Sequence, residues 1–194
     1  RAQKGQSMTN YWFVGASYGG NDDQTERFLQ EGIWQSGNDG KYIDVVKTIK
    51  PGDKIAIKSA YTQKNGLPFK TNGHTASVMA IKAIGTVIEN KKDGYEIVVD
   101  WKPFTNHRYW YFYTKRTRLW KLKGTDGMAR ELIDFAFHND EQDIDKFRNA
   151  NYWRERFGDD ANEVNKYPWI SFYSELADAL RGYRHRRDEL MSAL

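Results

Sequence analysis

Apolar and polar residues alternate in short runs along the first 125 or so residues of this chain, a pattern that is typical of β-strands. Glycine, proline and aspartate separate the runs, and Asp93-Gly94 predicts a tight hairpin turn between two of them. The six predicted strands cover residues 11–16, 54–59, 78–90, 95–101, 109–114 and 117–123.

Apolar residues return at helical spacing in two short early stretches and again after Gly124. Met128, Leu132 and Phe137 fall on one face of a predicted helix that Asp126 can cap. The other predicted helices cover residues 24–30, 42–50, 141–149 and 171–194. Together these elements predict an α+β fold: a small, partly open β-barrel of about six strands with flanking helices and a C-terminal helical extension.

The residue types that catalysis and metal binding require are missing or scattered. The chain has no cysteine, which excludes disulfides, thiolate zinc sites and a cysteine nucleophile. It has no phosphate-binding loop motif and no serine in a nucleophile elbow, and none of its four histidines pairs with another ligand at metal-binding spacing. We therefore expect a binding protein that is not an enzyme and needs no cofactor or metal.

The same composition bears on the compartment of the protein. No apolar run approaches the roughly 18 residues of a membrane span, so we expect no membrane partner. Residues 1–7 are polar, lack the apolar core of a signal peptide, and are interpreted as an artificial remnant or a linker. The absence of cysteine fits a reducing cytosol, and we expect a cytoplasmic protein.

The net charge of +4 conceals an uneven distribution along the chain. Residues 1–125 carry 20 Lys and Arg against 11 Asp and Glu, whereas residues 126–194 carry 10 against 15. The basic front half predicts a polyanionic partner, and the aromatic residues among its cations favour nucleic acid, because flat rings stack on bases. The cations predicted to hold a nucleic-acid backbone are Lys58, Lys64, Lys70, Arg108, Lys115 and Arg116.

Two groups of aromatic side chains allow both a structural and a binding interpretation. Trp12 and Trp34 lie at the edges of predicted elements, where they either close the ends of a small barrel or line a pocket. Strand alternation over residues 109–113 places Trp110 and Phe112 on one face and the three tyrosines on the other. About half of the rings in this strand are therefore structural.

Several short motifs follow one another in a characteristic order. They are Tyr11–Ala16, Gly32-Ile33-Trp34, Ile49–Ser59, Gly85-Thr86-Val87 and Val98–Trp101. In this order they resemble the EVE domain family, which belongs to the PUA-like superfamily together with YTH and ASCH domains. Asp23–Phe28 and the aromatic strand 110–113 are similar to the subgroup at the N-terminus of McrB-type AAA+ GTPases, the motors of modification-dependent restriction. The resemblance covers about residues 8–157.

The resemblance implies a PUA-like reader domain over residues 8–157, followed by a linker and C-terminal helix at 158–194 that lead towards a motor domain. Such readers flip a modified nucleotide into an aromatic pocket, at a cost of a few kcal/mol, while basic loops hold the backbone. Trp34 would stack on the base and Ser59 would bind its edge. The implied pocket residues are Trp12, Ser17, Tyr18, Trp34, Ser59, Tyr61 and Trp101.

The expected partners are double-stranded DNA that carries a modified base, an AAA+ motor domain and a nuclease subunit. A modified cytosine is expected ahead of N6-methyladenine, with both left open. Two alternatives remain: a PUA-like reader of RNA, and a protein-interaction adaptor that uses the aromatic strand and the acidic rear. The arginine cluster at residues 181–187 would contact the motor or DNA, or form a solvated helix face.

Overall fold

A computed structural model of the chain describes residues 8–37, 39–125, 127–159, 161 and 180. It divides into two compact units. The first unit takes the chain up to Gly66 together with Thr75–Ile144, and the second takes Leu67–His74 together with the chain from Asp145 onward. The single domain predicted over residues 8–157 therefore contains parts of both units.

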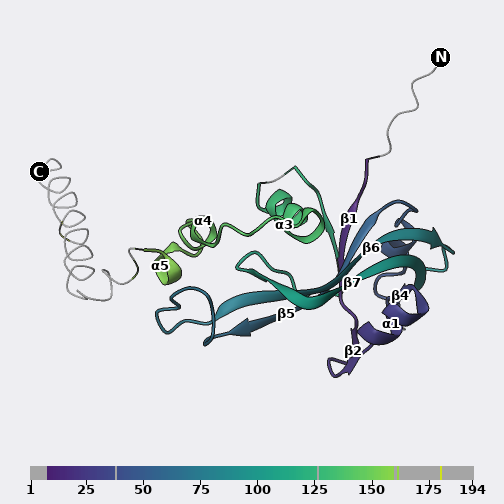
Figure 1. The fold of residues 1–194 in the computed structure, drawn as a ribbon, viewed down its shortest axis with the longest axis horizontal. Coiled ribbons are helices and arrows are strands. Elements are labelled where there is room, and N and C mark those ends of the chain that lie inside the picture. Colours follow the sequence, from purple (N-terminus) through teal and green to yellow (C-terminus); the bar gives the residue numbers. More distant parts are fainter. Residues whose placement is uncertain (1–7, 38, 126, 160, 162–179, 181–194) are drawn as a thin grey trace, which may run out of the picture. The chain divides into compact units, whose positions relative to one another are not determined.

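The first unit is built on a six-stranded mixed sheet that curls into a half-barrel (Figure 1). Its strands, in sheet order, are β4 (Ile33–Gln35), β7 (Glu96–Tyr111), β6 (Ala76–Asn90), β5 (Lys54–Gln63), β1 (Tyr11–Val14) and β8 (Leu119–Leu122). Strands β1 and β5 are parallel, and the other neighbouring pairs are antiparallel. The expected α+β fold with a partly open barrel is confirmed.

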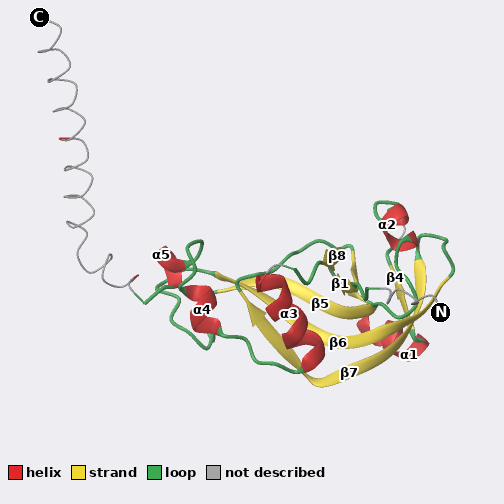
Figure 2. Cartoon of the chain, turned by 90° about the horizontal axis from the view of Figure 1, so that it is seen from above, coloured by secondary structure: helices red, strands yellow, loops and turns green. Residues whose placement is uncertain are grey.

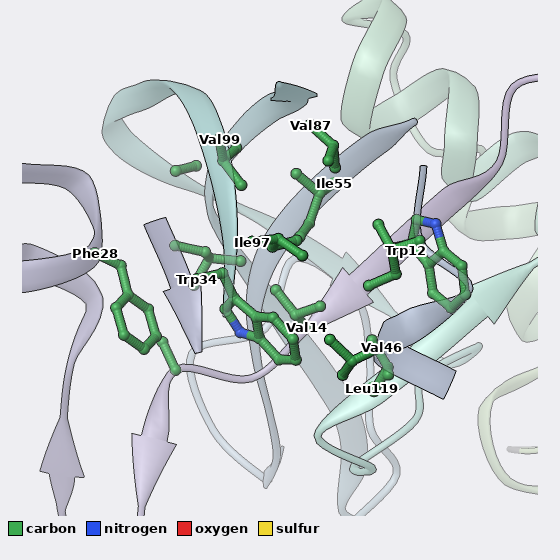
Figure 3. Close-up of a cluster of buried hydrophobic side chains, with 14 residues drawn as sticks. Trp12, Val14, Phe28, Trp34, Val46, Ile55, Val87, Ile97, Val99 and Leu119 are labelled. Atoms are coloured by element: carbon green, nitrogen blue, oxygen red, sulfur yellow. The ribbon is translucent and has the colours of Figure 1, made fainter. Parts of the chain in front are cut away.

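Side chains of β1 alternate between the two faces of this sheet. Trp12 and Val14 enter one buried cluster, which they share with Phe28 and Trp34 (Figure 3). Phe13 points to the opposite face, where its ring centroid lies 5.8 Å from that of Phe137. Because both faces are covered, this strand has a continuous apolar sequence instead of an alternating one.

Three helices pack on the sheet of the first unit. They are α1 (Thr25–Glu31), α2 (Ile43–Lys47) and α3 (Gly127–His138). The side chain of Asp23 accepts a hydrogen bond from the backbone N–H of Thr25 at the start of α1 (2.9 Å). Helix α3 buries Leu132, Ile133 and Phe135. The apolar spacing after Gly124 therefore marks a real core-facing helix.

Strand β7 joins two strands that the sequence predicted to be separate, 95–101 and 109–114. It pairs with β6 on both sides of an irregular stretch, in which residues 104–107 lie opposite the single residue Lys82. Pro103 stands at the start of this stretch, where a missing N–H interrupts the ladder at little cost. Since prolines are uncommon inside strands, the sequence concealed the continuity.

Gly85 allows a close approach of two strands and does not lie at a bulge. It pairs regularly with Trp101, while the register shifts of β6 fall at Lys82 and Ile88. A Cβ atom at Gly85 would lie 2.6 Å from Cγ1 of Val99, which is closer than real Cβ contacts. Glycine therefore leaves room for the side chains of Val99 and Trp101, in β7, to pack closely against this part of β6.

Strands β5, β6 and β7 continue beyond the end of β1 (Figure 2). Strand β1 pairs with β5 only over Lys54–Ile57. Past that point the sheet is a three-stranded ribbon, which we call the distal ribbon. It consists of Lys58–Gln63, Ala76–Ile81 and Arg108–Tyr111. A small separate ribbon, β2 (Ser17–Tyr18) paired with β3 (Asp22–Asp23), follows β1 in the chain.

The strand alternation at the end of β7 stops at Phe112. Trp110 and Phe112 are buried, as one face of the predicted strand, while Tyr109 is exposed. The φ angle of Phe112 is +71°, so the chain turns and the ring of Tyr113 lies 5.5 Å from that of Trp120. The prediction that Tyr113 shares a face with the other tyrosines is therefore wrong.

The second unit combines two separate stretches of chain. It contains α5 (Arg154–Phe157), most of α4 (Ile144–Arg148) and the loop Leu67–His74. The ring of Phe157 lies 6.2 Å from that of Phe69 and 6.0 Å from that of His74. The side-chain amide of Asn72 donates to the carbonyl oxygen of Arg156 (3.1 Å). The loop between β5 and β6 thus takes part in the core of the second unit.

Several predictions fall outside the described residues. These are the segment 1–7, the cap Asp126, the C-terminal helix at 171–194 and the arginine cluster at 181–187. Within the described part of the chain, no helix has the length and apolar character that a membrane crossing requires.

Candidate functional site

A pocket of about 530 Å³ opens in the first unit at the point where β1 ends and β5 runs on. Its volume falls within the range of about 300–1,000 Å³ that is usual for ligand pockets. Four stretches of chain line it: the segment after β1, the loop before α2, the middle of β5 and the segment before β8. The lining residues are Gly15, Ala16, Ser17, Gly20, Asp39, Lys41, Tyr42, Lys58, Ser59, Ala60, Tyr61, Arg116, Thr117 and Arg118.

The peptide groups of Gly15 fix one edge of this pocket. The N–H of Gly15 donates to the carbonyl oxygen of Arg118 (2.7 Å). The carbonyl oxygen of Gly15 accepts a hydrogen bond from the indole N–H of Trp34 (2.9 Å). The edge is therefore tied both to the segment before β8 and to β4.

The guanidinium of Arg118 connects this edge to the loop before α2. Its Nη1 donates to the carbonyl oxygen of Ser36 (2.6 Å) and to Oδ2 of Asp39 (2.8 Å). Gly37 has a φ of +79°, and a Cβ there would lie 3.3 Å from the same nitrogen. The hydrogen bond from Arg118, together with one from the backbone of Lys41, lowers the pKa of Asp39. The loop therefore holds an ionised carboxylate against the arginine.

The pocket mouth is basic. Lys41 and Arg116 are exposed and Arg118 is half-buried, whereas Asp39 supplies the single carboxylate among the lining side chains. The ring of Tyr42 has the Lys41 ammonium 5.4 Å from its centroid. An anion that enters this mouth meets more positive than negative charge.

A second pocket of about 750 Å³ lies next to the first and shares Asp39 and Arg118 with it. Tyr18 lines this second pocket and donates from its hydroxyl to the carbonyl oxygen of Gln35 (3.3 Å). Burial raises the pKa of this tyrosine. Tyr18, predicted to line the base pocket, is therefore separated from Ser59 and Tyr61 by the pair of Arg118 and Asp39.

Lys58 is buried and bound to the protein itself, which corrects its prediction as a phosphate ligand. Its side chain is almost inaccessible, and its Nζ donates to the carbonyl oxygens of Lys115 (2.6 Å) and Thr117 (2.7 Å). Burial, and secondarily the charge of Lys115, lowers the pKa of Lys58 to about 8. The amine thus holds in place the segment that carries Arg116 into the pocket.

The lowered pKa of Lys58 predicts that its contribution to stability depends on pH. Between about pH 8 and the usual lysine value of 10.5, the unfolded chain binds more protons at this position than the folded one. As the pH rises over that interval, the free energy of unfolding should therefore increase by up to about 1.4 kcal/mol per pH unit. This gain is lost again as the pH falls through about 8. The neutral amine keeps two N–H donors for its two carbonyl partners.

Urea denaturation of the wild type and of Lys58→Met at about pH 7 and about pH 10 tests this expectation. The stability advantage of the wild type should be larger at the higher pH. Lys64→Met, which removes an exposed lysine of the same unit, is the matched control and should show no such increase. An advantage of the wild type that does not change with pH would contradict the assignment.

Trp12 is a core residue and not a pocket wall, which corrects its prediction. Its side chain has no exposed surface, and its indole N–H donates to Oδ2 of Asp53 (2.9 Å). The same buried carboxylate accepts three more hydrogen bonds, from the backbone and the side chain of Asn10 and from the backbone of Lys50. The Pro-Gly-Asp turn thus ties the start of β1 to β5.

Trp34 and Trp101 are also held inside the structure. Trp34 sits in the centre of β4, has no exposed surface and binds the pocket edge only through its indole N–H. Trp101 is partly buried, and its indole N–H donates to the carbonyl oxygen of Ile33 (2.9 Å). Neither ring lines the pocket, so the structure corrects the predicted stacking role of Trp34 and the pocket role of Trp101.

The remaining predicted cations are divided between the two units. Lys115 and Arg116 are exposed beside the pocket, and Lys64 is exposed at the end of β5. Lys70 is exposed in the second unit. Arg108 is bound internally, since its guanidinium donates to the carbonyl oxygens of Phe135 and Asp140 and lies 4.0 Å from the Phe135 ring centroid. It is therefore a link between β7 and α3, and its predicted phosphate role is corrected.

Sequence reasoning placed Ser17, Ser59, Tyr61 and Arg116 in the site, and all four line the pocket. It missed the loop residues Asp39, Lys41 and Tyr42, and it did not include Arg118 among the predicted site residues. A signal was present, because the polar loop 35–41 directly follows the Gly-Ile-Trp motif and ends in a cation beside an aromatic ring. No pattern within the loop showed that it folds back towards β5.

Among the residues that the structure describes, no group of three or more histidine, aspartate or glutamate side chains could hold a metal ion. Neither a family model nor a curated protein sequence matches this chain.

Proposed function

We propose that the first unit is a DNA-binding specificity domain that takes a modified base into the pocket beside β5 at the end of β1. The observation that carries the proposal is the pocket itself, which combines two tyrosine rings, two serine hydroxyls and a basic mouth. Its volume suits a ligand of the size of a base. Tyr42 and Tyr61 offer the ring surfaces, and Ser59 offers a hydrogen-bonding group for the edge of the base.

The basic mouth supports a polyanionic partner. Arg116 is exposed there and can contact a phosphate directly, while Arg118 is held by Asp39. Base flipping costs a few kcal/mol, and stacking on a ring returns about 1–3 kcal/mol. A role in modification-dependent restriction, with an AAA+ motor and a nuclease as partners, rests on the resemblance of Asp23–Phe28 and of the aromatic strand 110–113.

A binding panel tests the proposal. Duplexes with one 5-methylcytosine, 5-hydroxymethylcytosine or N6-methyladenine are compared with unmodified DNA and matched RNA at two salt concentrations. We expect the wild type to prefer one modified duplex and Tyr42→Ala to lose that preference. Arg116→Ala should weaken binding to all duplexes alike and reduce the salt slope by about one.

Lys123→Ala is the matched control for the arginine variant. This exposed cation follows the end of β8 that pairs with Tyr11, away from the pocket end at Val14. Its removal should leave both affinity and salt slope close to those of the wild type. A modified-to-unmodified ratio that survives in Tyr42→Ala would rule out this pocket as the reading site, and tighter binding of RNA would favour an RNA reader.

A further inference from the structure

Three tyrosines share one face of the distal ribbon. Tyr61 of β5 and Tyr111 of β7 both pair with Val78 of the central strand β6, and Tyr109 pairs with Ala80 two residues along. Partners in register point to the same face of a sheet, as do residues two apart in a strand. The rings of Tyr61 and Tyr111 therefore flank β6, about 10 Å apart at their strands, which is twice the usual strand spacing.

These tyrosines form an accessible surface above smaller residues of β6. Tyr61 and Tyr109 are 37% and 46% exposed, whereas Val78 and Ala80 beneath them are buried. Burial raises the pKa of both Tyr61 and Tyr111, and the neighbouring hydroxyl of Tyr109 adds to each shift. The strand register places the three residues on one face of neighbouring strands, and we call Tyr61, Tyr109 and Tyr111 the tyrosine platform.

On the opposite face of the same ribbon, β7 packs against α3. Trp110 is completely buried there, with its ring centroid 5.1 Å from that of Phe135 in α3. Arg108 binds the carbonyl oxygen of Phe135 on the same side. Core packing therefore explains the aromatic residue at 110 but not the exposed rings at 109 and 61.

The tyrosine platform is continuous with the pocket. Tyr61 belongs to both, and Ser59, which lines the pocket, lies in register with Ala80 and Tyr109. The cations Lys41 and Arg116 stand at the pocket mouth beside it. A row of flat rings next to a positively charged edge is the arrangement that proteins use to bind single-stranded nucleic acid.

We propose that the tyrosine platform binds unpaired DNA nucleotides that flank the pocket, by stacking their bases on Tyr109 and its neighbours. This inference rests on the proposed function, because it takes the occupant of the pocket to be part of a DNA strand. The platform supplies affinity that is independent of any modification, while the pocket supplies the discrimination.

The test measures the affinity of the full chain for an unmodified single-stranded oligothymidine of about 12 nucleotides, a length within usual site sizes. Tyr109→Ala should weaken this binding roughly 5- to 100-fold, which corresponds to one stacked base. Tyr109→Phe keeps the ring and should bind like the wild type. Tyr152→Ala removes a more exposed tyrosine (77%) of the second unit and should have no effect.

A second oligonucleotide, with abasic sites in place of half its bases, checks that stacking is the cause. It should bind the wild type more weakly than the intact strand does, and Tyr109→Ala should distinguish the two strands much less. Thermal unfolding of each variant confirms that it is folded. Equal affinities of Tyr109→Ala and Tyr152→Ala would overturn the platform.

The outcomes separate this inference from the function that it extends. Wild-type preference for a modified duplex that Tyr109→Ala retains at full affinity would overturn the platform and leave the pocket in place. Loss of single-strand binding in Tyr109→Ala, in a protein without any modification preference, would support the platform and overturn the pocket. If the wild type bound no nucleic acid at low salt, the proposed role of the tyrosine platform would be overturned as well. The same holds if the platform proved to bind a protein partner, with Tyr109→Ala as the one variant that fails to bind it.

Discussion

Replacing Asp53 with alanine is expected to lower the free energy of unfolding by about 4 kcal/mol. The carboxylate is 3% exposed and accepts four hydrogen bonds, from the backbone and side chain of Asn10, the indole of Trp12 and the backbone of Lys50. Removing it leaves buried donors without an acceptor, and each such donor costs about 1–3 kcal/mol.

Urea denaturation measures this loss, which should appear as a lower midpoint with an unchanged m value. Asp53→Asn retains one acceptor oxygen and should lose about half as much. Asp100→Ala removes an exposed carboxylate from β7 and should change stability by no more than about 0.5 kcal/mol. If Asp53→Ala were as mild as Asp100→Ala, Asp53 would not be the link between the start of β1 and β5.

Replacing Trp34 is expected to lower the free energy of unfolding. It should weaken binding only indirectly, by disturbing the pocket edge at Gly15. Trp34→Ala removes a fully buried ring and should cost about 3–5 kcal/mol. Trp34→Phe keeps most of the packing but leaves the carbonyl oxygen of Gly15 without its donor, at a cost of about 1–3 kcal/mol. Because Gly15 forms the pocket edge, this variant should also lose part of the proposed preference for a modified base.

Trp101→Phe is the matched control, since its indole N–H also binds a carbonyl oxygen, that of Ile33, without touching the pocket. It should lose a similar amount of stability and keep the preference. Both quantities come from thermal unfolding and from the duplex panel. A Trp34→Ala variant of unchanged stability but without base preference would restore the stacking role that the sequence suggested.

The sequence predicted the sheet well where local rules decide the structure. The strand over residues 54–59 and the Asp93-Gly94 turn are both present, in β5 and in the β6–β7 hairpin, although Ile55 to Lys58 are all buried instead of alternating. The continuity of β7 was not predictable from local rules, because the register across residues 104–107 depends on pairing with β6. The partnership of Phe69 with Phe157 joins residues far apart in the chain and was likewise hidden.

For the candidate site, the sequence identified the right region more reliably than the right rings. Ser59 and Tyr61 line the pocket because they lie on the part of β5 that continues past the end of β1. The resemblance implied that Trp34 stacks on the base, but alternation within β4 turns its side chain inward. The burial of Lys58 could not be foreseen, since its two carbonyl partners lie more than 50 residues away.

The composition of the second unit has a consequence for how the chain can be shortened. Its two stretches, Leu67–His74 and the chain from Asp145, are joined to the first unit by three separate crossings of the backbone. A protein that ends at Ile144 would keep the whole six-stranded sheet but deprive Phe69 and His74 of the Phe157 ring that they contact. A shortened chain that keeps the first unit should therefore either extend through Phe157 or replace the loop between β5 and β6 with a short turn.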